Sequence, residues 1–280
     1  MKIVSNRIGW IDNHWIQNDE LKLPIINRGQ TLSDGIFETI LILQNKPLLL
    51  KAHLNRWKLS AKVLGMASPP SKAIVEPLIH EAIERASLFN GNGALRLNWC
   101  RGNNNTRGIN VSTTKKSSNE QILWLELNEH NPSFQPISTM ISCHEARNAK
   151  SQINQCKTFA YLQSIQARHE ANLAGYEDAL LLSTNGEICC GATSNILVKR
   201  KGEWLTPRAQ SGCLPGVMRQ QGLKSGIFKE AEISPQPESN DQWLLINSLS
   251  CQPIYKINTT YLESYSEAEI LWHSLLIEKI

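Results

Sequence analysis

Short β-like runs alternate with two helical stretches in the first third of the sequence, and this pattern restricts the chain to folds that mix helices and strands. In residues 53–64, apolar side chains recur every three or four positions, as on one face of a helix. Residues 72–88 continue in the same way after the Pro69-Pro70 pair, so both stretches are predicted to be helices. The β-like runs, which we expect to be strands, cover residues 8–11, 14–16, 37–43, 47–50, 94–100 and 121–127.

A polar segment that carries two prolines, residues 128–136, follows this region. Interdomain connections often have this composition, so we expect a domain boundary here. This interpretation divides the chain into an N-terminal α+β domain (1–128), a linker (129–136) and a C-terminal domain (137–280). In the C-terminal domain the patterns predict strands at 137–143, 178–183, 187–190, 195–199 and 243–246, and helices at 161–174, from about 216 and at 266–280.

The composition is that of a globular protein with a sizeable core. Of the 280 residues, 41% are hydrophobic and 19% are charged, and the net charge is only +4. Scattered positive charge of this size does not indicate nucleic-acid binding. The first fifteen residues lack the apolar run of a secretory signal, and no stretch of eighteen apolar residues occurs, so we expect a cytoplasmic protein without a membrane span. The seven cysteines show no CxxC spacing, which favours reduced thiols and indicates no metal site.

Lys157 precedes the helix expected at 161–174 and has Cys156 and Phe159 beside it. A lysine that forms a Schiff base must be partly desolvated, because its amine reacts in the neutral form. Apolar neighbours of this kind would provide that environment. The alternative is a solvated lysine at a helix N-terminus, which is the common situation because lysine is rarely buried.

Six short motifs follow one another along the chain, and together they favour the Schiff-base role of Lys157 over that of a solvated lysine. The motifs are RGQTLSDGIFET (28–39), HLNRWKLSA (53–61), KTFAY (157–161), DALLL (178–182), TSNI (193–196) and SGCLPGVMR (211–219). Their order resembles that of the class IV, or fold type IV, aminotransferases, a family that includes the aminodeoxychorismate lyases and the branched-chain aminotransferases. Asn247-Ser248-Leu249 extends the match, whereas Ser33 replaces a glycine that is usual in the family.

The resemblance implies a two-domain enzyme that uses pyridoxal 5′-phosphate. A small α+β N-terminal lobe and a larger C-terminal β-pseudobarrel lobe would enclose the cofactor in the cleft between them, and the protein would form a homodimer. Carried over to this chain, the family assigns the Schiff base and proton transfer at the substrate Cα to Lys157, and the cofactor phosphate to Arg56. The backbone N–H groups of Val217 and Met218, at a helix N-terminus, would also bind the phosphate, and Ser248 would add a hydroxyl donor.

The family pattern implies further contacts to cofactor and substrate. Tyr161 would donate a hydrogen bond to the cofactor phenolate oxygen, and Thr193 would lie in a turn that reaches the cofactor. Arg101 and Arg107 follow a β-like run and would bind the substrate carboxylates. The alternatives are an ordinary amphipathic-helix residue for Tyr161 and a polar hairpin loop for the two arginines.

Position 190 departs from the family. A glutamate five residues before the asparagine that matches Asn195 normally pairs with the pyridine nitrogen of the cofactor, and this chain has Cys190 there. Glu187 lies three positions earlier, and strand alternation would direct the two side chains to opposite faces unless a bulge intervenes. A thiol is a weak hydrogen-bond donor and would not keep the ring nitrogen protonated as a buried carboxylate does. The alternative is that Cys190 only packs in the core.

The resemblance and the departure together favour 4-amino-4-deoxychorismate lyase, which forms 4-aminobenzoate and pyruvate for folate synthesis from a small-molecule substrate. A weaker electron sink affects transamination more than a reaction whose product becomes aromatic. Two alternatives stay open: an aminotransferase for branched-chain or D-amino acids, and a catalytically weakened or cofactor-free relative that retained the scaffold.

Overall fold

The computed structural model describes residues 7–17, 27–102, 108–111 and 121–276. The chain forms two compact units. The first takes in Met1–Asn131 and Cys156–Ala160, and the second takes in Pro132–Gln155 and Tyr161–Ile280. The short segment Cys156–Ala160 was expected in the C-terminal domain but groups with the first unit. The ring of Phe159 packs there, with its centroid 5.5 Å from the ring centroid of Trp124 and 6.2 Å from that of Phe37.

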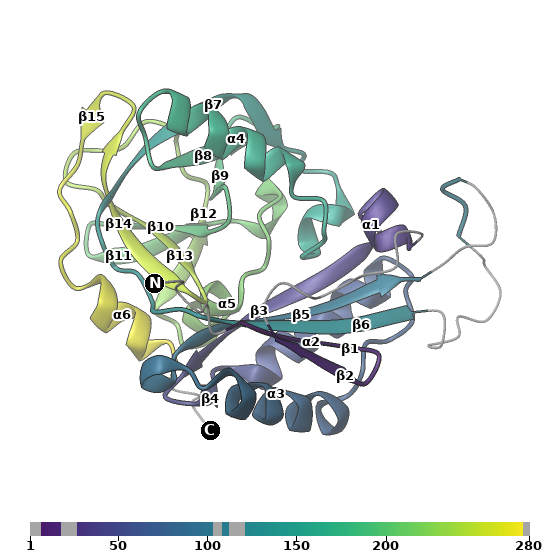
Figure 1. Cartoon of the computed structure of the whole chain (residues 1–280). Helices are drawn as coiled ribbons and strands as arrows, with labels where there is room; N and C mark the ends of the chain where they lie inside the picture. The colour runs from purple at the N-terminus through teal and green to yellow at the C-terminus, as the bar shows by residue number, and fades with distance from the viewer. Residues whose placement is uncertain (1–6, 18–26, 103–107, 112–120, 277–280) are drawn as a thin grey trace. The chain divides into compact units, whose positions relative to one another are not determined.

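The first unit is an antiparallel sheet of six strands in the order β2-β1-β6-β5-β3-β4, with two long helices on one face (Figure 1). The prediction of an α+β unit here is confirmed. Its strands are β1 (Ile8–Ile11), β2 (His14–Gln17), β3 (Gly35–Leu43), β4 (Lys46–Pro47), β5 (Gly93–Arg101) and β6 (Gln121–Glu129), and its helices are α1 (Arg28–Leu32), α2 (Leu50–Val63), α3 (Lys72–Ala86) and the 3-10 turn η2 (Phe89–Gly91).

The apolar period of α2 explains how that helix packs. Trp57 and Ala61 are buried against Ile36, Ile40 and Ile42, which are alternate residues of β3.

The strand predicted at 47–50 is wrong. β4 ends at Pro47, and α2 begins at Leu50. The cause lies at Leu49, whose φ of 51° is left-handed and therefore ends the extended conformation.

The second unit is a nine-stranded sheet that curls round, as Figure 1 shows, and the predicted pseudobarrel is confirmed. The strand order is β12-β11-β10-β13-β14-β7-β8-β9, with β15 beside β14. The strands are β7 (Ile137–Arg147), β8 (Asp178–Ser183), β9 (Ile188–Gly191), β10 (Asn195–Arg200), β11 (Glu203–Pro207), β12 (Phe228–Ala231), β13 (Gln242–Asn247), β14 (Ser250–Ile257) and β15 (Thr260–Tyr261); the helices are η4 (Gln152–Gln155), α4 (Leu162–Leu173), η5 (Ala209–Ser211), α5 (Val217–Lys224) and α6 (Ala268–Ser274).

Helix α4 packs on β7 and β8 through small residues. Ala167 and Ala171 are fully buried and share a cluster with Ala179 and Leu181 of β8. Their small side chains allow the helix to approach the sheet closely, which brings the polar side chains of the first turn of α4 near the end of β7. In the described part of the chain, no helix combines the length and the apolar character needed to cross a bilayer.

Candidate functional site

Lys157 lies in a short extended segment that pairs with the edge of β3. The backbone N–H of Phe37 donates to the carbonyl of Lys157 at 2.9 Å, and the N–H of Phe159 donates to the carbonyl of Gly35 at 2.9 Å. A β-carbon on Gly35 would stand 2.3 Å from the ring of Phe159, so only glycine fits there. The backbone therefore joins the SDGIFET and KTFAY motifs, which are far apart in the sequence.

The half-buried side chain of Lys157 has the ring of Phe37 as its aromatic neighbour, whereas the sequence suggested Phe159. Its Nζ atom is 4.4 Å from the centre of the Phe37 ring. The guanidinium of Arg96 stacks on the same ring, with Cζ 3.5 Å from the centre, while its Nε donates to Asn98 Oδ1 at 2.7 Å. None of the sequence motifs includes Arg96, and the structure puts its positive charge near the lysine that is expected to react.

The Arg56 side chain is fixed by a buried carboxylate on β3. Arg56 Nε donates to Glu38 Oε1 at 2.8 Å, and Nη2 donates to Glu38 Oε2 at 2.5 Å. His53, one turn earlier on α2, is bonded through Nδ1 to Glu38 Oε2 at 2.7 Å. Burial raises the pKa of Glu38, but the positive charge of Arg56 and the hydrogen bonds from His53 and Arg56 outweigh this effect and hold the pKa at about 2.

His53 connects this group with the lysine. Burial lowers the pKa of His53; Glu38 opposes that effect, and the positive charges of Arg56 and Lys157 add to it. The ring is thus neutral at pH 7, and Nδ1–H donates to Glu38. Within the first unit, the structure therefore brings the predicted Lys157 and Arg56 near two buried groups. These are Glu38 and His53, for which the sequence analysis proposed no role.

Arg101, predicted to bind substrate, is engaged within the protein. Its Nη1 donates to Asp34, and its Nη2 donates to the carbonyl of Leu64 at 2.7 Å. Arg28 donates to the same carboxylate at 2.8 Å and also to the carbonyls of residues 108–110. Asp34 thus lies between two guanidinium groups, and the Arg101 side chain is held by Asp34 and by the carbonyl of Leu64. Arg107, the other predicted substrate arginine, lies outside the described residues.

In the second unit, the TSNI motif ties three turns together. Asn195 Nδ2 donates to the carbonyl of Leu214 at 2.9 Å, in the turn that precedes α5. The amide of Asn247 donates to Ser194 Oγ at 3.0 Å and so joins the same turn to the end of β13. Ser248, half-buried, follows in the turn between β13 and β14. These hydrogen bonds bring together the turns that carry Thr193, Ser248 and the start of α5.

The N-terminus of α5 fits an anionic group. Val217 and Met218 are its first two residues and are buried, and its N-cap residue, Gly216, provides no side chain that could bond to the first N–H groups. Helix N-termini bind phosphate through such N–H groups and through the helix dipole. Thr193 is exposed, and its hydroxyl accepts a hydrogen bond from Arg168 at 3.2 Å.

A bulge determines the direction of the cysteine side chains on β9. Leu181 pairs with Cys190, but Leu182 pairs with Ile188, so Cys189 is an extra residue in the ladder. Cys189 and Cys190 accordingly belong to one buried cluster instead of pointing to opposite faces. The simple alternation used to compare Glu187 with Cys190 does not hold across this bulge, and Glu187 itself lies half-buried in the turn before β9.

Arg147, at the end of β7, lies beside Cys190. Its Nε is 3.5 Å from Cys190 Sγ, its Nη1 donates to Gln163 Oε1 at 2.7 Å, and its Nη2 donates to Ser164 Oγ at 2.8 Å. Burial lowers the pKa of Arg147, but Cys190 and, more weakly, Tyr161 raise it, and the net shift is upward. The structure thus brings Cys190 and Tyr161 to one arginine that the sequence did not indicate.

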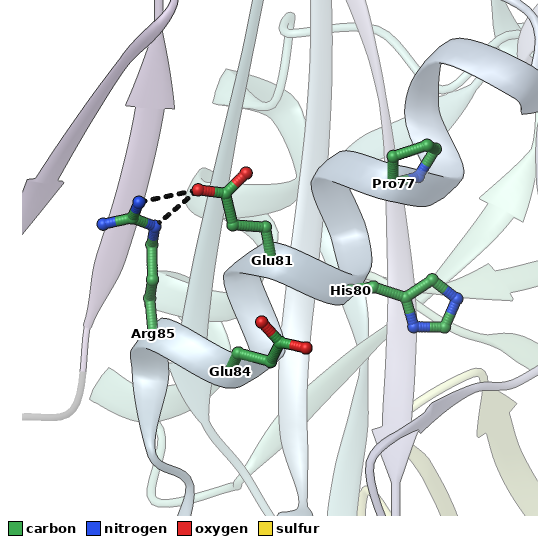
Figure 2. A pocket seen from close by; sticks show the side chains of 5 residues that line it. All are labelled: Pro77, His80, Glu81, Glu84 and Arg85. Atoms are coloured by element: carbon green, nitrogen blue, oxygen red, sulfur yellow. Dashed lines mark hydrogen bonds and ion pairs between the residues drawn. The ribbon is translucent and has the colours of Figure 1, made fainter.

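A shallow hollow on the outer side of α3 is separate from all of these residues. Figure 2 shows that its side chains come from one helix and that Arg85 is bonded to Glu81, at 2.8 and 2.6 Å. A hollow lined only by one face of a helix offers no converging groups for catalysis. Its lining residues are Pro77, His80, Glu81, Glu84 and Arg85.

Comparison with known proteins identifies the family. Residues 35–257 match the family described as Amino-transferase class IV. The chain belongs to this family. Class IV aminotransferases use pyridoxal 5′-phosphate, so the chain is an enzyme that depends on this cofactor, and the resemblance drawn from its motifs is confirmed.

The relatives differ in the activities that their names give. A putative aminodeoxychorismate lyase of Schizosaccharomyces pombe is 28% identical over 221 residues, which cover 76% of this chain and 85% of that protein. The branched-chain-amino-acid aminotransferase-like protein 2 of Arabidopsis thaliana is 25% identical over 264 residues, which cover 90% of this chain, and the chain spans only 46% of that protein's length. The pyridoxal-phosphate-bound structure of a hypothetical aminotransferase from Mycobacterium tuberculosis has the same fold, with a TM-score of 0.79 and 19% identity over 97% of each chain.

Proposed function

We propose that this class IV protein is a 4-amino-4-deoxychorismate lyase that releases pyruvate and leaves 4-aminobenzoate. The observation that carries the proposal is the side chain at position 190, which is a cysteine bonded by Arg147 where the family has a carboxylate. In either ionisation state, sulfur is a weaker hydrogen-bond partner than a carboxylate. A reaction driven by aromatisation of its product depends less on the cofactor ring than transamination does.

The residues present fit the cofactor. Pyridoxal phosphate, when bound, supplies a carbonyl carbon that reacts with amines and a conjugated ring that delocalises negative charge from the substrate Cα. Arg56 offers a guanidinium whose direction is fixed by Glu38, and the N-terminus of α5 offers N–H groups without a side-chain cap. Both are suited to a phosphate dianion.

Lys157 has two tasks in this proposal. Its amine would hold the cofactor covalently, and in its free form it would take the proton from the substrate Cα as a general base. The ring of Phe37, 4.4 Å from Nζ, shields the amine from water on one side.

The substrate has carboxylates that need cationic partners. Arg101 is already paired with Asp34, so we assign this contact to Arg96 and Arg107. Support for Arg96 comes from its stacking on Phe37, the residue that also lies beside Lys157. A guanidinium held by a ring and by Asn98 keeps its direction and can orient a carboxylate for reaction.

Two assays test the proposal. The purified enzyme, supplied with aminodeoxychorismate and pyridoxal phosphate, should release 4-aminobenzoate and pyruvate in equal amounts. In parallel, branched-chain and D-amino acids are offered with 2-oxoglutarate, and the lyase proposal requires a much slower reaction. Fast glutamate formation with no 4-aminobenzoate would establish the aminotransferase alternative instead.

Borohydride trapping tests the cofactor linkage separately. Reduction followed by peptide mapping should find the pyridoxyl group on Lys157, and a Lys157→Ala variant should give no such peptide. A colourless protein that gains no visible absorption after incubation with the cofactor would favour the cofactor-free relative. We also infer a homodimer from the family resemblance, which light scattering of the purified protein tests.

A further inference from the structure

Arg147 lies in the second unit with an unbalanced charge. It is half-buried, and its hydrogen-bond acceptors are Gln163 Oε1, Ser164 Oγ, the carbonyl of Ala192 and the sulfur of Cys190. Among the residues that the structure describes, none of these acceptors is a carboxylate. Taking a guanidinium partly out of water without a counter-charge is unfavourable. Of its four partners, only Cys190 can become an anion.

The surroundings of Cys190 favour that anion. A hydrogen bond from Cys189 lowers the pKa of Cys190 to about 6; burial opposes the shift, and the charge of Arg147 adds to it. The bulge makes the first interaction possible, because it directs two successive side chains of β9 into one cluster. Ser211 Oγ in turn donates to Cys189 Sγ at 3.5 Å.

Three further ionisable groups lie near Cys190 and Arg147. Asp178, on β8, disfavours a second negative charge, but its carboxylate is already paired with Arg168 at 2.7 Å. Burial raises the pKa of Cys213, the third thiol of the cluster, so this group stays protonated at neutral pH. Tyr161 faces Arg147 from the N-terminal end of α4. The single anion in the cluster is therefore expected at Cys190.

We propose that Cys190 is a buried thiolate paired with Arg147, and that this anion serves as the charge partner of the cofactor's ring nitrogen. The role as charge partner of the ring nitrogen rests on the proposed function, since it requires pyridoxal phosphate in this enzyme. The negative charge that the family has as a carboxylate is then retained on sulfur. The hydrogen bond to the ring nitrogen is weaker, because sulfur is a poor acceptor. Protonation of the thiolate below about pH 6 would remove this charge.

The thiolate is tested by ¹³C NMR of the full-length protein labelled at cysteine Cβ, recorded with and without added cofactor. Cys143, the exposed cysteine, is replaced by serine in every sample so that it does not contribute to the titration. The Cys190 signal is identified by its absence from the spectrum of Cys190→Ser. In the protein that retains Cys190, this signal should titrate with a midpoint near pH 6. Arg147→Met should raise this midpoint by two pH units or more, and Arg147→Lys, which keeps a cation, should raise it less.

A Cys190 signal that stays in the thiol form up to pH 8, or a midpoint that Arg147→Met leaves unchanged, would overturn the pairing. Cys189→Ala is the second variant, and it should also raise the midpoint because it removes the S–H donor. Circular dichroism of each variant confirms that it is folded before its titration is interpreted.

The role of Cys190 as charge partner of the ring nitrogen is tested by ¹⁵N NMR of pyridoxal phosphate labelled at the ring nitrogen. At pH 7.5 the ring nitrogen should be more protonated in the wild type than in Cys190→Ser, and more protonated in Cys190→Glu than in the wild type. Equal ¹⁵N chemical shifts of the ring nitrogen in the wild type and in Cys190→Ser would overturn this role of Cys190. If borohydride reduction gives no pyridoxyl adduct at Lys157, the proposed function is contradicted. The titration of Cys190 in the absence of cofactor tests the ion pair with Arg147 whatever the outcome of that experiment.

Discussion

The side-chain oxygen of Asn195 lies 2.0 Å from the position that a β-carbon on Gly216 would take. The same side chain donates from Nδ2 to the carbonyl of Leu214 at 2.9 Å. The TSNI motif and the LPG turn are therefore in close contact, and this contact sets where α5 begins. A residue with any side chain at position 216 would have to displace either the asparagine or the first turn of the helix.

Gly216→Ala is expected to weaken cofactor binding. Overpacking at a site of this kind destabilises a protein by about 1–3 kcal/mol, and here the displaced atoms include the N–H groups of Val217 and Met218. We expect the dissociation constant for pyridoxal phosphate, measured by its visible absorption, to rise about tenfold or more. Lys224→Ala, at the exposed far end of α5, is the matched control and should bind as the wild type does. Equal affinity in the two variants would contradict the role given to this turn.

Glu38→Gln should lower both stability and cofactor affinity. The change leaves Arg56 without the carboxylate to which it is bonded twice, and loss of one partner of a buried ion pair costs about 3 kcal/mol of unfolding free energy. Urea denaturation measures the first effect, and a spectral titration measures the second. Glu76→Gln is the control, because Glu76 is paired with Lys72 on the surface and such pairs contribute less than about 1 kcal/mol.

The buried Glu38 also predicts a loss of stability in acid. Its pKa is about 2 in the folded chain, below the ordinary value of 4.5, so its contribution is complete above pH 4.5 and disappears as the pH falls towards 2. A shift of this size corresponds to roughly 3 kcal/mol. The pKa of His53 is also lowered, so this group too destabilises the folded state as the pH falls below 6.5. Urea unfolding at a series of pH values should show less loss below pH 4.5 in Glu38→Gln than in the wild type.

Part of this network could be read from the sequence. Ile36, Ile40 and Ile42 mark the buried face of one strand, and Glu38 occupies an alternate position on that face. A charged residue among inward-facing apolar residues requires a buried partner. The helix with Trp57 on its apolar face was predicted as well, so the sequence placed the two elements that meet at this carboxylate.

Other features depend on long-range pairing that local patterns do not contain. The bulge at Cys189 arises from the register of β9 against β8, and the position of Arg147 depends on the packing of β7 under α4. β14 was not predicted, since Pro253 and several polar residues interrupt any alternation. The pairing of β11 with β12 is parallel and spans a helix, and short strands of this kind carry little local signal.

The ion pair between Asp34 and Arg101 allows a last prediction, which separates a structural role of Arg101 from a direct contact with substrate. If the pair positions the local backbone, Arg101→Gln and Asp34→Asn remove the same interaction, and the double variant should lose little more activity than either single one. Arg28, which is bonded to the same carboxylate and to the carbonyls of residues 108–110, would lose its carboxylate partner in Asp34→Asn and in the double variant. A direct substrate contact gives another result: Arg101→Gln would raise KM far more than Asp34→Asn, and the effects would add. Steady-state kinetics of the four proteins in this double-mutant cycle distinguish the two roles, and the short, well-shielded ion pair leads us to expect the first.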